Sequence, residues 1–316
     1  GIRIRFAIGA ARNTEEIALL PELIAAYGDL CNACVNVPLD ENGVLDNELI
    51  GQSVYAVQRI ANITPRGEGN FNFTVNFNCK PFIPYFPAGY HLSHLPNSFV
   101  IGLETPDLLV EVLKSVPKSP HNQFYADCYR AMSQALQYHV DQVLEILSTV
   151  KLSGEFEFAG IDSSAAPSKN CASMTKVYEL MGLPYFGAVG SVEVSALLTK
   201  VFKSIQHVPL VGFSGLMLAV TEDLGLAEGT QKHYFDIRAL LTYSAVCGIG
   251  LDTVPVAGNA KAESIAAIMR DTGTMAFRLN KPLTVRLFPI PNKVAGEISE
   301  FESDDLCNCR LLHIPD

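Results

Sequence analysis

Residues 243–259 read YSAVCGIGLDTVPVAGN. Up to Val246 this segment has the composition of the end of an apolar helix, and from Cys247 onward glycines, a carboxylate, a threonine and a proline follow in quick succession. Glycine at this density indicates positive φ angles or close approach of the backbone. A carboxylate within an apolar run needs a partner, because burying a lone charge is costly. We expect a loop here that belongs to a functional site.

The segments on both sides of this stretch alternate between strand and helix patterns along the whole chain. Strands are predicted at 2–8, 30–37, 71–77, 98–103, 157–161, 208–213 and 283–288. Helices are predicted from Asn13 to about Gly28, at 46–63, from 105 onward, and at 121–149, 172–181, 191–205, 235–246 and 262–277. This order predicts an α/β fold with a largely parallel, buried sheet. No linker divides the sequence, so we expect one domain over residues 1–316.

The amino-acid composition indicates which classes of function are not expected for this protein. Of the 316 residues, 48% are hydrophobic and 18% are charged, and the net charge is −10. Without a basic cluster, binding to nucleic acid is not expected. No unbroken apolar run approaches the roughly 18 residues of a membrane span, and the chain opens without the pattern of a secretory leader. Eight scattered cysteines in a chain of this size are typical of reduced thiols, so we expect a soluble cytoplasmic protein.

Polar residues follow four of the predicted strands directly. They are Asn78, Glu104, Asp162 and Ser214. The carboxyl ends of parallel strands gather at one face of an α/β fold, where ligands bind. The alternative for any one of them is a local function, because Glu104 and Asp162 each stand where a residue can cap the next helix. For the set we expect a pocket, shared with the segment that begins at Cys247.

Two acidic segments and one basic residue are the further candidates. Asp252, followed by Thr253, lies among the glycines and is the strongest candidate for an acid or base. Glu222 and the adjacent Asp223 form a second acidic pair, of which one member can cap a helix. Arg286, in the last predicted strand, can hold an anionic group of a substrate or merely solvate a surface.

His91 and Cys247 are the candidates with imidazole and thiol chemistry. His91 follows Tyr90 in a proline-rich loop and suits a proton carrier. With His94 it can also form part of a metal site, but the spacing alone does not fix a geometry. Cys247 can be a nucleophile or a small core residue, and free cysteine is among the most often buried residue types.

The familiar cofactor motifs are missing. Gly248-Ile-Gly250 lacks the third glycine and the following helix of a dinucleotide site, and no phosphate-binding loop with its lysine occurs. The sequence therefore shows no motif for a nucleotide cofactor, and it assigns no other cofactor or metal.

Several longer motifs resemble one family. They are FPAGYH at 86–91, VIGLE at 100–104, GIDSS at 160–164, VGFSGLM at 211–217, SAVCGIGLDTVP at 244–255 and KPLTVR at 281–286. In this order they resemble the domain-of-unknown-function family numbered seven hundred and eleven (DUF711). The resemblance is clear over 70–316, whereas 1–69 fits more loosely and looks like a shortened opening segment.

The resemblance implies a fold similar to the ten-stranded α/β barrel of pyruvate formate-lyase-type enzymes, and a homo-oligomer. It implies no reaction. Where the family has P-x-P-G-D, residues 255–259 read PVAGN, and residues 310–313 (RLLH) lack the glycyl-radical signature. Radical chemistry is therefore not expected.

Our leading hypothesis is a barrel enzyme that uses acid/base chemistry on a small polar metabolite, which can carry an anionic group. The expected catalytic residues are Asp252, Glu104, His91 and Cys247, and the expected substrate-binding residues are Asn78, Tyr90, Asp162, Ser214, Glu222, Thr253 and Arg286. The alternative is a non-catalytic protein on the same fold, either a small-molecule-binding protein or an oligomeric scaffold. The two differ in a testable way, because an enzyme should gather its carboxylates at one cavity and perturb the titration of at least one.

Overall fold

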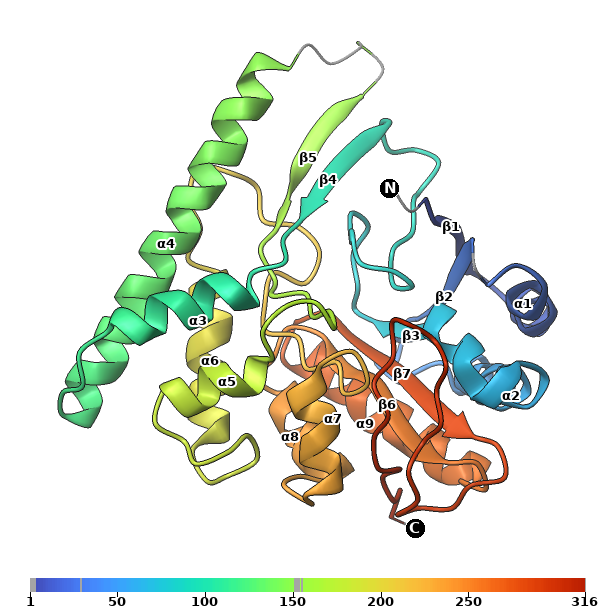
Figure 1. Ribbon diagram of the computed structural model, residues 1–316. Coiled ribbons are helices and arrows are strands. Elements are labelled where there is room, and N and C mark those ends of the chain that lie inside the picture. The colour runs from blue at the N-terminus through green and yellow to red at the C-terminus, as the bar shows by residue number, and fades with distance from the viewer. Residues whose placement is uncertain (1–3, 29, 151–153, 155, 316) are drawn as a thin grey trace.

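The structure is a computed structural model that describes residues 4–28, 30–150, 154 and 156–315 (Figure 1). Its strands are β1 (Phe6–Ala11), β2 (Cys31–Val37), β3 (Phe73–Phe77), β4 (Ser98–Gly102), β5 (Glu157–Asp162), β6 (Gly250–Ala257) and β7 (Leu283–Ile290). Its helices are α1 (Thr14–Tyr27), α2 (Asn47–Ile63), the 3₁₀ segment η1 (Pro65–Asn72), α3 (Pro106–Ser115), α4 (His121–Thr149), α5 (Met174–Leu180), α6 (Ser191–Phe202), α7 (Leu224–Gln231), α8 (Ile237–Ser244) and α9 (Ala262–Arg278). Residues 2 and 3 of the predicted first strand lie outside the described residues.

Two sheets organise these elements. The larger has the order β1-β2-β3-β7-β6, and the smaller pairs β4 with β5. All strand pairs are parallel except β3 with β7. Isolated parallel bridges add Leu210 beside Ile161 of β5 and Ala219 beside Asp252 of β6. The predicted α/β class with mostly parallel strands is thus confirmed, while the described residues form seven strands and no closed barrel.

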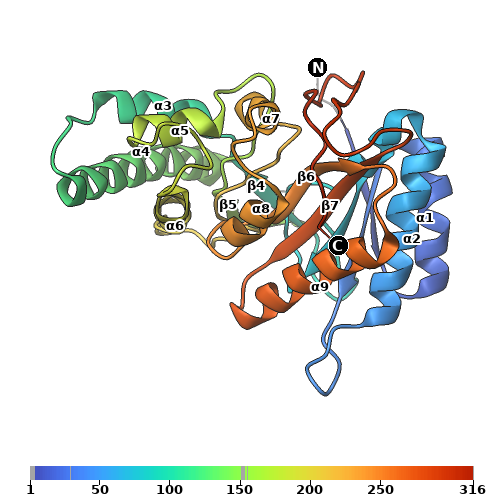
Figure 2. The ribbon, with the colours of Figure 1, turned by 90° about the horizontal axis from the view of Figure 1, so that it is seen from below.

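The large sheet has an apolar and a polar face. Ala33, Val35 and Val37 of β2 belong to the main hydrophobic core, as do the alternate residues of β3, β6 and β7. Helices α1, α2 and α9 cover this face, as Figure 2 shows. Because side chains alternate along a strand, the intervening residues point to the other face. On the central strands these are Asn32, Cys34, Asn36, Thr74, Asn76, Asp252, Thr284 and Arg286.

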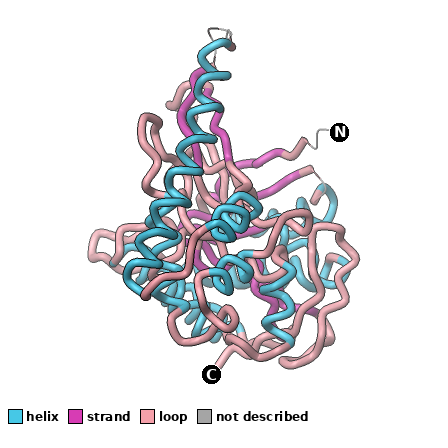
Figure 3. The backbone as a smooth tube through the Cα atoms, turned by 60° about the vertical axis from the view of Figure 1, so that its left-hand side comes forward, coloured by secondary structure: helices cyan, strands magenta, loops and turns pink. Residues whose placement is uncertain are grey.

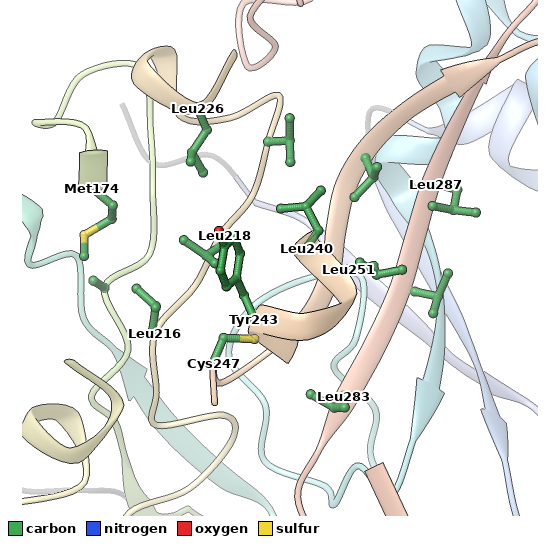
Figure 4. Close-up of a cluster of buried hydrophobic side chains, with 14 of the residues drawn as sticks. Met174, Leu216, Leu218, Leu226, Leu240, Tyr243, Cys247, Leu251, Leu283 and Leu287 are labelled. Atoms are coloured by element: carbon green, nitrogen blue, oxygen red, sulfur yellow. The ribbon is translucent and has the colours of Figure 1, made fainter. Parts of the chain in front are cut away.

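Helices α3, α4, α5 and α6 lie on the other side of the molecule, whereas α8 packs against β6 of the large sheet. In Figures 1 and 3 the long helix α4 runs beside β4 and β5. Between the two halves lies a buried cluster that includes Leu226 of α7, Leu240 of α8 and Leu251 of β6 (Figure 4). In the part of the chain that the structure describes, no helix has the length and apolarity that crossing a bilayer requires.

Several helices begin directly after a residue whose side chain caps them. The side chain of Asn13 accepts a hydrogen bond from Glu16 N at 2.8 Å, which confirms the predicted start of α1. Asp223 caps α7 and accepts from Leu226 N at 3.1 Å. The local function considered for one member of the 222–223 pair therefore belongs to Asp223, and α7 itself was not predicted.

Two predicted elements differ from the structure. Residues 208–213 form a single bridge instead of a strand, because Gly212 at φ +61° turns the backbone toward Asp162. The N–H groups of Phe213 and Ser214 then bond to that carboxylate instead of a neighbouring strand. The segment after Cys247, predicted to be a loop, is the fully buried strand β6. Its glycines serve close approach, since a Cβ on Gly250 would lie 2.6 Å from Thr284 O.

Candidate functional site

Arg286 on the polar face of β7 is the centre of the candidate site. Its side chain is 6% exposed, and its Nε donates to Asp252 Oδ1 at 2.7 Å. Nη2 donates to Glu222 Oε1, and Nη1 donates to the carbonyl oxygen of Phe71 at 3.1 Å. The guanidinium also lies over the ring of Phe71, 5.2 Å from its centroid. Each of the three guanidinium nitrogens of Arg286 thus donates a hydrogen bond, and two of these bonds go to carboxylates.

A bulge in β6 brings the two carboxylates together. The register with β7 shifts between Leu251 and Val254, so Asp252 and Thr253 both stand opposite Arg286. Thr253 adopts φ 45°, and its hydroxyl oxygen accepts from Thr221 N at 3.1 Å. This contact holds the segment that carries Glu222 against the strand. Thr253 is buried, so its contribution is to position the neighbouring groups.

Glu222, Asp252 and Arg286 form a triad of charged groups. Burial and neighbouring charges affect the pKa values of Glu222 and Arg286 in different ways. Burial raises the pKa of Glu222 to about 7, even though Arg286 pulls it down, and the nearby carboxylates Asp252 and Asp305 raise it further. For Arg286, burial favours the neutral form, but Asp252 and Glu222 outweigh it and raise the pKa of the guanidinium. Glu222 is therefore the carboxyl group that changes charge near neutral pH, while Arg286 stays a cation.

A cavity of about 190 Å³ opens on this triad. Glu222, Asp252 and Arg286 line one wall together with the hydroxyl-bearing Thr74 and Thr284. The opposite wall is apolar and comes mainly from the proline-rich loop at 84–88 and from Phe213, Met217 and Ile249. Charged groups beside apolar surface in a small cavity are typical of sites that bind and convert small molecules.

A second cavity adjoins the first. It has a volume of about 260 Å³ and shares Glu222, Phe86 and Pro167 with it. Charged side chains of both signs line this second cavity, among them Arg5, Lys169 and Asp305. Because it lines both spaces and its side chain is 17% exposed, Glu222 is in a position to reach a bound molecule.

Glu104 and Asp162 do not line these cavities. Glu104 is exposed and accepts a hydrogen bond from Ser168 Oγ at 2.7 Å. Asp162 is fully buried and accepts from Ser164, from Phe213 N at 2.7 Å and from Ser214 N at 2.9 Å. Burial raises its pKa, and these hydrogen bonds oppose the increase. Asp162 thus joins two loops instead of capping the next helix, which begins only at Met174, and Ser214 belongs to the same junction.

The other predicted residues lie apart from the triad. Exposed His91 and its neighbour Tyr90 line a separate cavity of about 750 Å³ beside β1 and α1. Asn78 lines another cavity, and its amide donates to Asn280 Oδ1 at 3.3 Å. The expected single pocket therefore collects Asp252, Glu222 and Arg286 only. In the described part of the chain, no group of three His, Cys, Asp or Glu side chains is arranged to hold a metal ion.

Cys247 lies within the buried cluster of Figure 4, beside Tyr243. Its Sγ accepts a hydrogen bond from Gly250 N at 3.3 Å. We expect Cys247→Ala to destabilise the protein by about 1–2 kcal/mol in urea unfolding, the effect of a small cavity. Alkylation of the native protein with iodoacetamide, followed by peptide mass spectrometry, should leave Cys247 unmodified. Rapid modification at neutral pH would instead support the reading of Cys247 as a nucleophile.

Thr74 and Thr284 are two lining residues that were not among those predicted from the sequence. Their signal was present, because polar residues recur at every second position in residues 72–76 and 284–286, where the intervening residues are apolar. Such a pattern in a buried strand indicates a second face that is not packed by helices.

The chain was also compared with the sequences of known proteins and protein families. The family model described as "Uncharacterised ACR (DUF711)" matches residues 2–303. A UPF0210 protein of Pyrobaculum aerophilum is 29% identical over 258 residues, which cover 79% of this chain and 56% of that protein. A UPF0210 protein of Syntrophobacter fumaroxidans is 26% identical over 296 residues, covering 90% of this chain and 64% of the relative. The chain therefore spans somewhat more than half the length of these relatives.

Proposed function

The chain belongs to the DUF711 family, and we propose that it is an enzyme that uses acid/base chemistry on a small polar metabolite. The observation that carries this proposal is the meeting of Glu222, Asp252 and Arg286 at one cavity, with a carboxyl pKa near neutrality. A group that titrates near the working pH is both an effective base and an effective acid. A carboxyl group with a raised pKa at a cavity supports an enzyme over a scaffold, whose acidic groups would serve caps or the surface.

In this mechanism the Glu222 carboxylate takes a proton from a carbon atom of the substrate and, as a carboxylic acid, returns one. Arg286 stays charged and stabilises the negative charge that develops on the substrate. Asp252 accepts from Arg286 Nε, so it orients the guanidinium and balances its charge. Asp252, which we expected to be an acid or base, thus becomes a positioning residue, and Glu222 becomes the catalytic one.

Proton exchange with solvent tests this function before the substrate is known. We expect the protein, incubated in D₂O with a mixture of small carboxylic and amino acids, to introduce deuterium into at least one of them, as detected by mass spectrometry. The rate should rise with pH through about 7, because only the ionised Glu222 accepts a proton.

The variant Glu222→Gln keeps the size of the side chain and should lower the exchange rate about 10²–10⁴-fold. Its matched control is Glu228→Gln, an exposed glutamate on α7, which should exchange at the wild-type rate. A Glu222→Gln variant that exchanges as fast as the wild type would exclude Glu222 as the catalytic base.

The ten-stranded barrel and the single-domain organisation also belong to this proposal. The bridges at Leu210 and Ala219 support the barrel, since they extend the small and the large sheet by one position each. All eight cysteines are free thiols, which supports a cytoplasmic location.

An exposed apolar strip on β1 supports association between copies of the chain. β1 is an edge strand, and Ile4, Phe6 and Ile8 in this segment are 63%, 56% and 44% exposed. We expect light scattering to give the mass of a homo-oligomer for the wild type and of a monomer for Phe6→Lys. Tyr138→Lys, at an exposed position on α4, should remain oligomeric. A monomeric wild type, or an oligomeric Phe6→Lys variant, would contradict this assignment.

A further inference from the structure

We propose that the two adjoining cavities bind a zwitterionic molecule, namely an α-amino acid with an apolar side chain. This inference rests on the proposed function, because it names the substrate class of the same site. The first cavity, which contains the triad and the apolar wall, would receive the side chain of the ligand. The second, which contains Arg5, Asn32 and Lys169, would receive its carboxylate.

A buried amide without a partner points to a ligand in the second cavity. Asn32 on the polar face of β2 is 2% exposed and lines this cavity. Its Nδ2 has no hydrogen-bond partner among the described residues. Leaving a buried donor unsatisfied costs about 1–3 kcal/mol, and such a donor is retained at a site when a bound molecule satisfies it. A donor calls for an acceptor, such as a carboxylate oxygen.

Cations lie around the same cavity and are held in place. Arg5 Nη1 donates to Asn72 Oδ1 at 2.9 Å, and Nη2 lies 3.5 Å from Asp305 Oδ2. Its guanidinium lies over Phe71, 5.7 Å from the ring centroid, so Phe71 contacts both Arg5 and Arg286. Lys169 Nζ donates to the carbonyl oxygen of Ser303 at 3.2 Å. Together with the Asn32 amide, these groups make one side of the cavity suitable for a carboxylate.

The charges of the side chains that line the two cavities disfavour a strongly anionic ligand. Among the described residues that line the two cavities, Arg5, Lys169 and Arg286 are cations. The carboxyl groups are those of Asp252, Asp304, Asp305 and Glu222. With Glu222 protonated, the charges cancel, and with Glu222 ionised, they sum to −1. A phosphate ester or a dicarboxylate would bring further negative charge into this surrounding, whereas a zwitterion adds none.

The ammonium group and the apolar side chain of an amino acid also find suitable partners in the two cavities. Glu222, which lines both cavities, and Asp305, which lines the second, offer acceptors for an ammonium group. Phe213, Met217 and Ile249 offer apolar contact in the first cavity. With the carboxylate at Asn32 and the side chain at Met217, the α-carbon lies at the junction of the cavities. Glu222 lines both cavities there and therefore faces the carbon that carries the exchangeable proton.

Three related molecules test which charges the site requires. We would measure binding of L-phenylalanine, phenethylamine, which lacks the carboxylate, and 3-phenylpropanoate, which lacks the ammonium group, by isothermal titration calorimetry. L-Leucine and L-methionine extend the test to other apolar side chains. We expect at least one of the three amino acids to bind, and the zwitterion to bind at least tenfold more tightly than either truncated analogue.

The variant Asn32→Asp places a carboxylate where the ligand carboxylate would lie and should weaken binding of the amino acid more than tenfold. Asn62→Asp, an exposed asparagine on α2, is the matched control and should bind like the wild type. Circular dichroism and thermal melting of each variant separate lost binding from lost folding.

The outcomes separate this inference from the proposed function. Failure of all three amino acids to bind, or equal binding of 3-phenylpropanoate, overturns the zwitterion assignment, even if solvent exchange of another metabolite depends on Glu222. Unchanged binding by a folded Asn32→Asp variant also overturns it. Conversely, Asn32-dependent binding of an amino acid without any Glu222-dependent exchange supports the ligand class and contradicts the proposed chemistry.

Discussion

Arg286→Met is expected to destabilise the protein by about 3–5 kcal/mol in urea unfolding at pH 7.5, because it leaves two buried carboxylates facing each other without their cation. In the native protein Arg286 bonds to Asp252 at 2.7 Å and also to Glu222. The loss should be smaller at pH 5.5. Glu222, whose pKa is raised to about 7, then takes up a proton, and the repulsion between the carboxylates decreases.

Two further variants test this explanation. The triple variant Arg286→Met, Asp252→Asn, Glu222→Gln removes every charge of the triad and should recover most of the lost stability, because a buried ion pair replaced as a whole is often tolerated. Arg278→Met removes an exposed arginine from the end of α9 and should change the stability by less than about 0.5 kcal/mol. If Arg286→Met unfolds within 1 kcal/mol of the wild type at both pH values, the triad does not contribute as described.

The second large effect on the free energy of unfolding is expected at Asp162. Asp162→Ala removes the acceptor of the Phe213, Ser214 and Ser164 N–H groups in a buried region. Each unsatisfied donor costs about 1–3 kcal/mol, so we expect a total loss of about 3–5 kcal/mol in the free energy of unfolding. Asp162→Asn retains one acceptor oxygen and should lose about half as much.

Two glycine-to-alanine variants, one beside Asp162 and one away from it, serve as comparisons for Asp162→Ala. A Cβ on Gly212 would lie 2.0 Å from Asp162 Oδ2, and its φ is +61°, so Gly212→Ala should destabilise the protein as severely as Asp162→Ala. In Gly51→Ala the new Cβ meets nothing within 4 Å, and alanine in helix α2 should stabilise it by about 0.5–1 kcal/mol. A well-folded Asp162→Ala variant that loses only solvent exchange would contradict the structural function of Asp162 and return it to the catalytic candidates.

The succession of helices and strands was largely predictable, because it depends on patterns between near neighbours. The predicted helix at 121–149 is α4 with the same bounds, and the strand at 283–288 is β7 with two further residues. The errors occurred where contacts distant in the chain override local preference. Residues 208–213 are as apolar as a strand, but Asp162 captures the backbone N–H groups that a strand would offer.

The candidate site was predictable only in part. Asp252 and Arg286 were marked by charge within apolar strands, a local signal, since buried charges need partners. The partners were not predictable. Nothing near Glu222 in the sequence distinguishes it from the adjacent Asp223, yet Asp223 caps α7 while Glu222 bonds to Arg286. The difference arises from the bulge at Thr253, which holds Thr221 and thereby turns Glu222 toward β7.

The amino-acid sequence by itself determined the class of the fold, the family and the presence of charged groups inside an apolar chain. These follow from periodicity and composition, which act over a few residues. The tertiary structure alone decided which charges meet, because β3, β6 and β7 bring Thr74, Asp252 and Arg286 to one face across more than two hundred residues. It also decided the protonation behaviour of Glu222, since a carboxyl pKa depends on the burial and the neighbouring charges that folding creates.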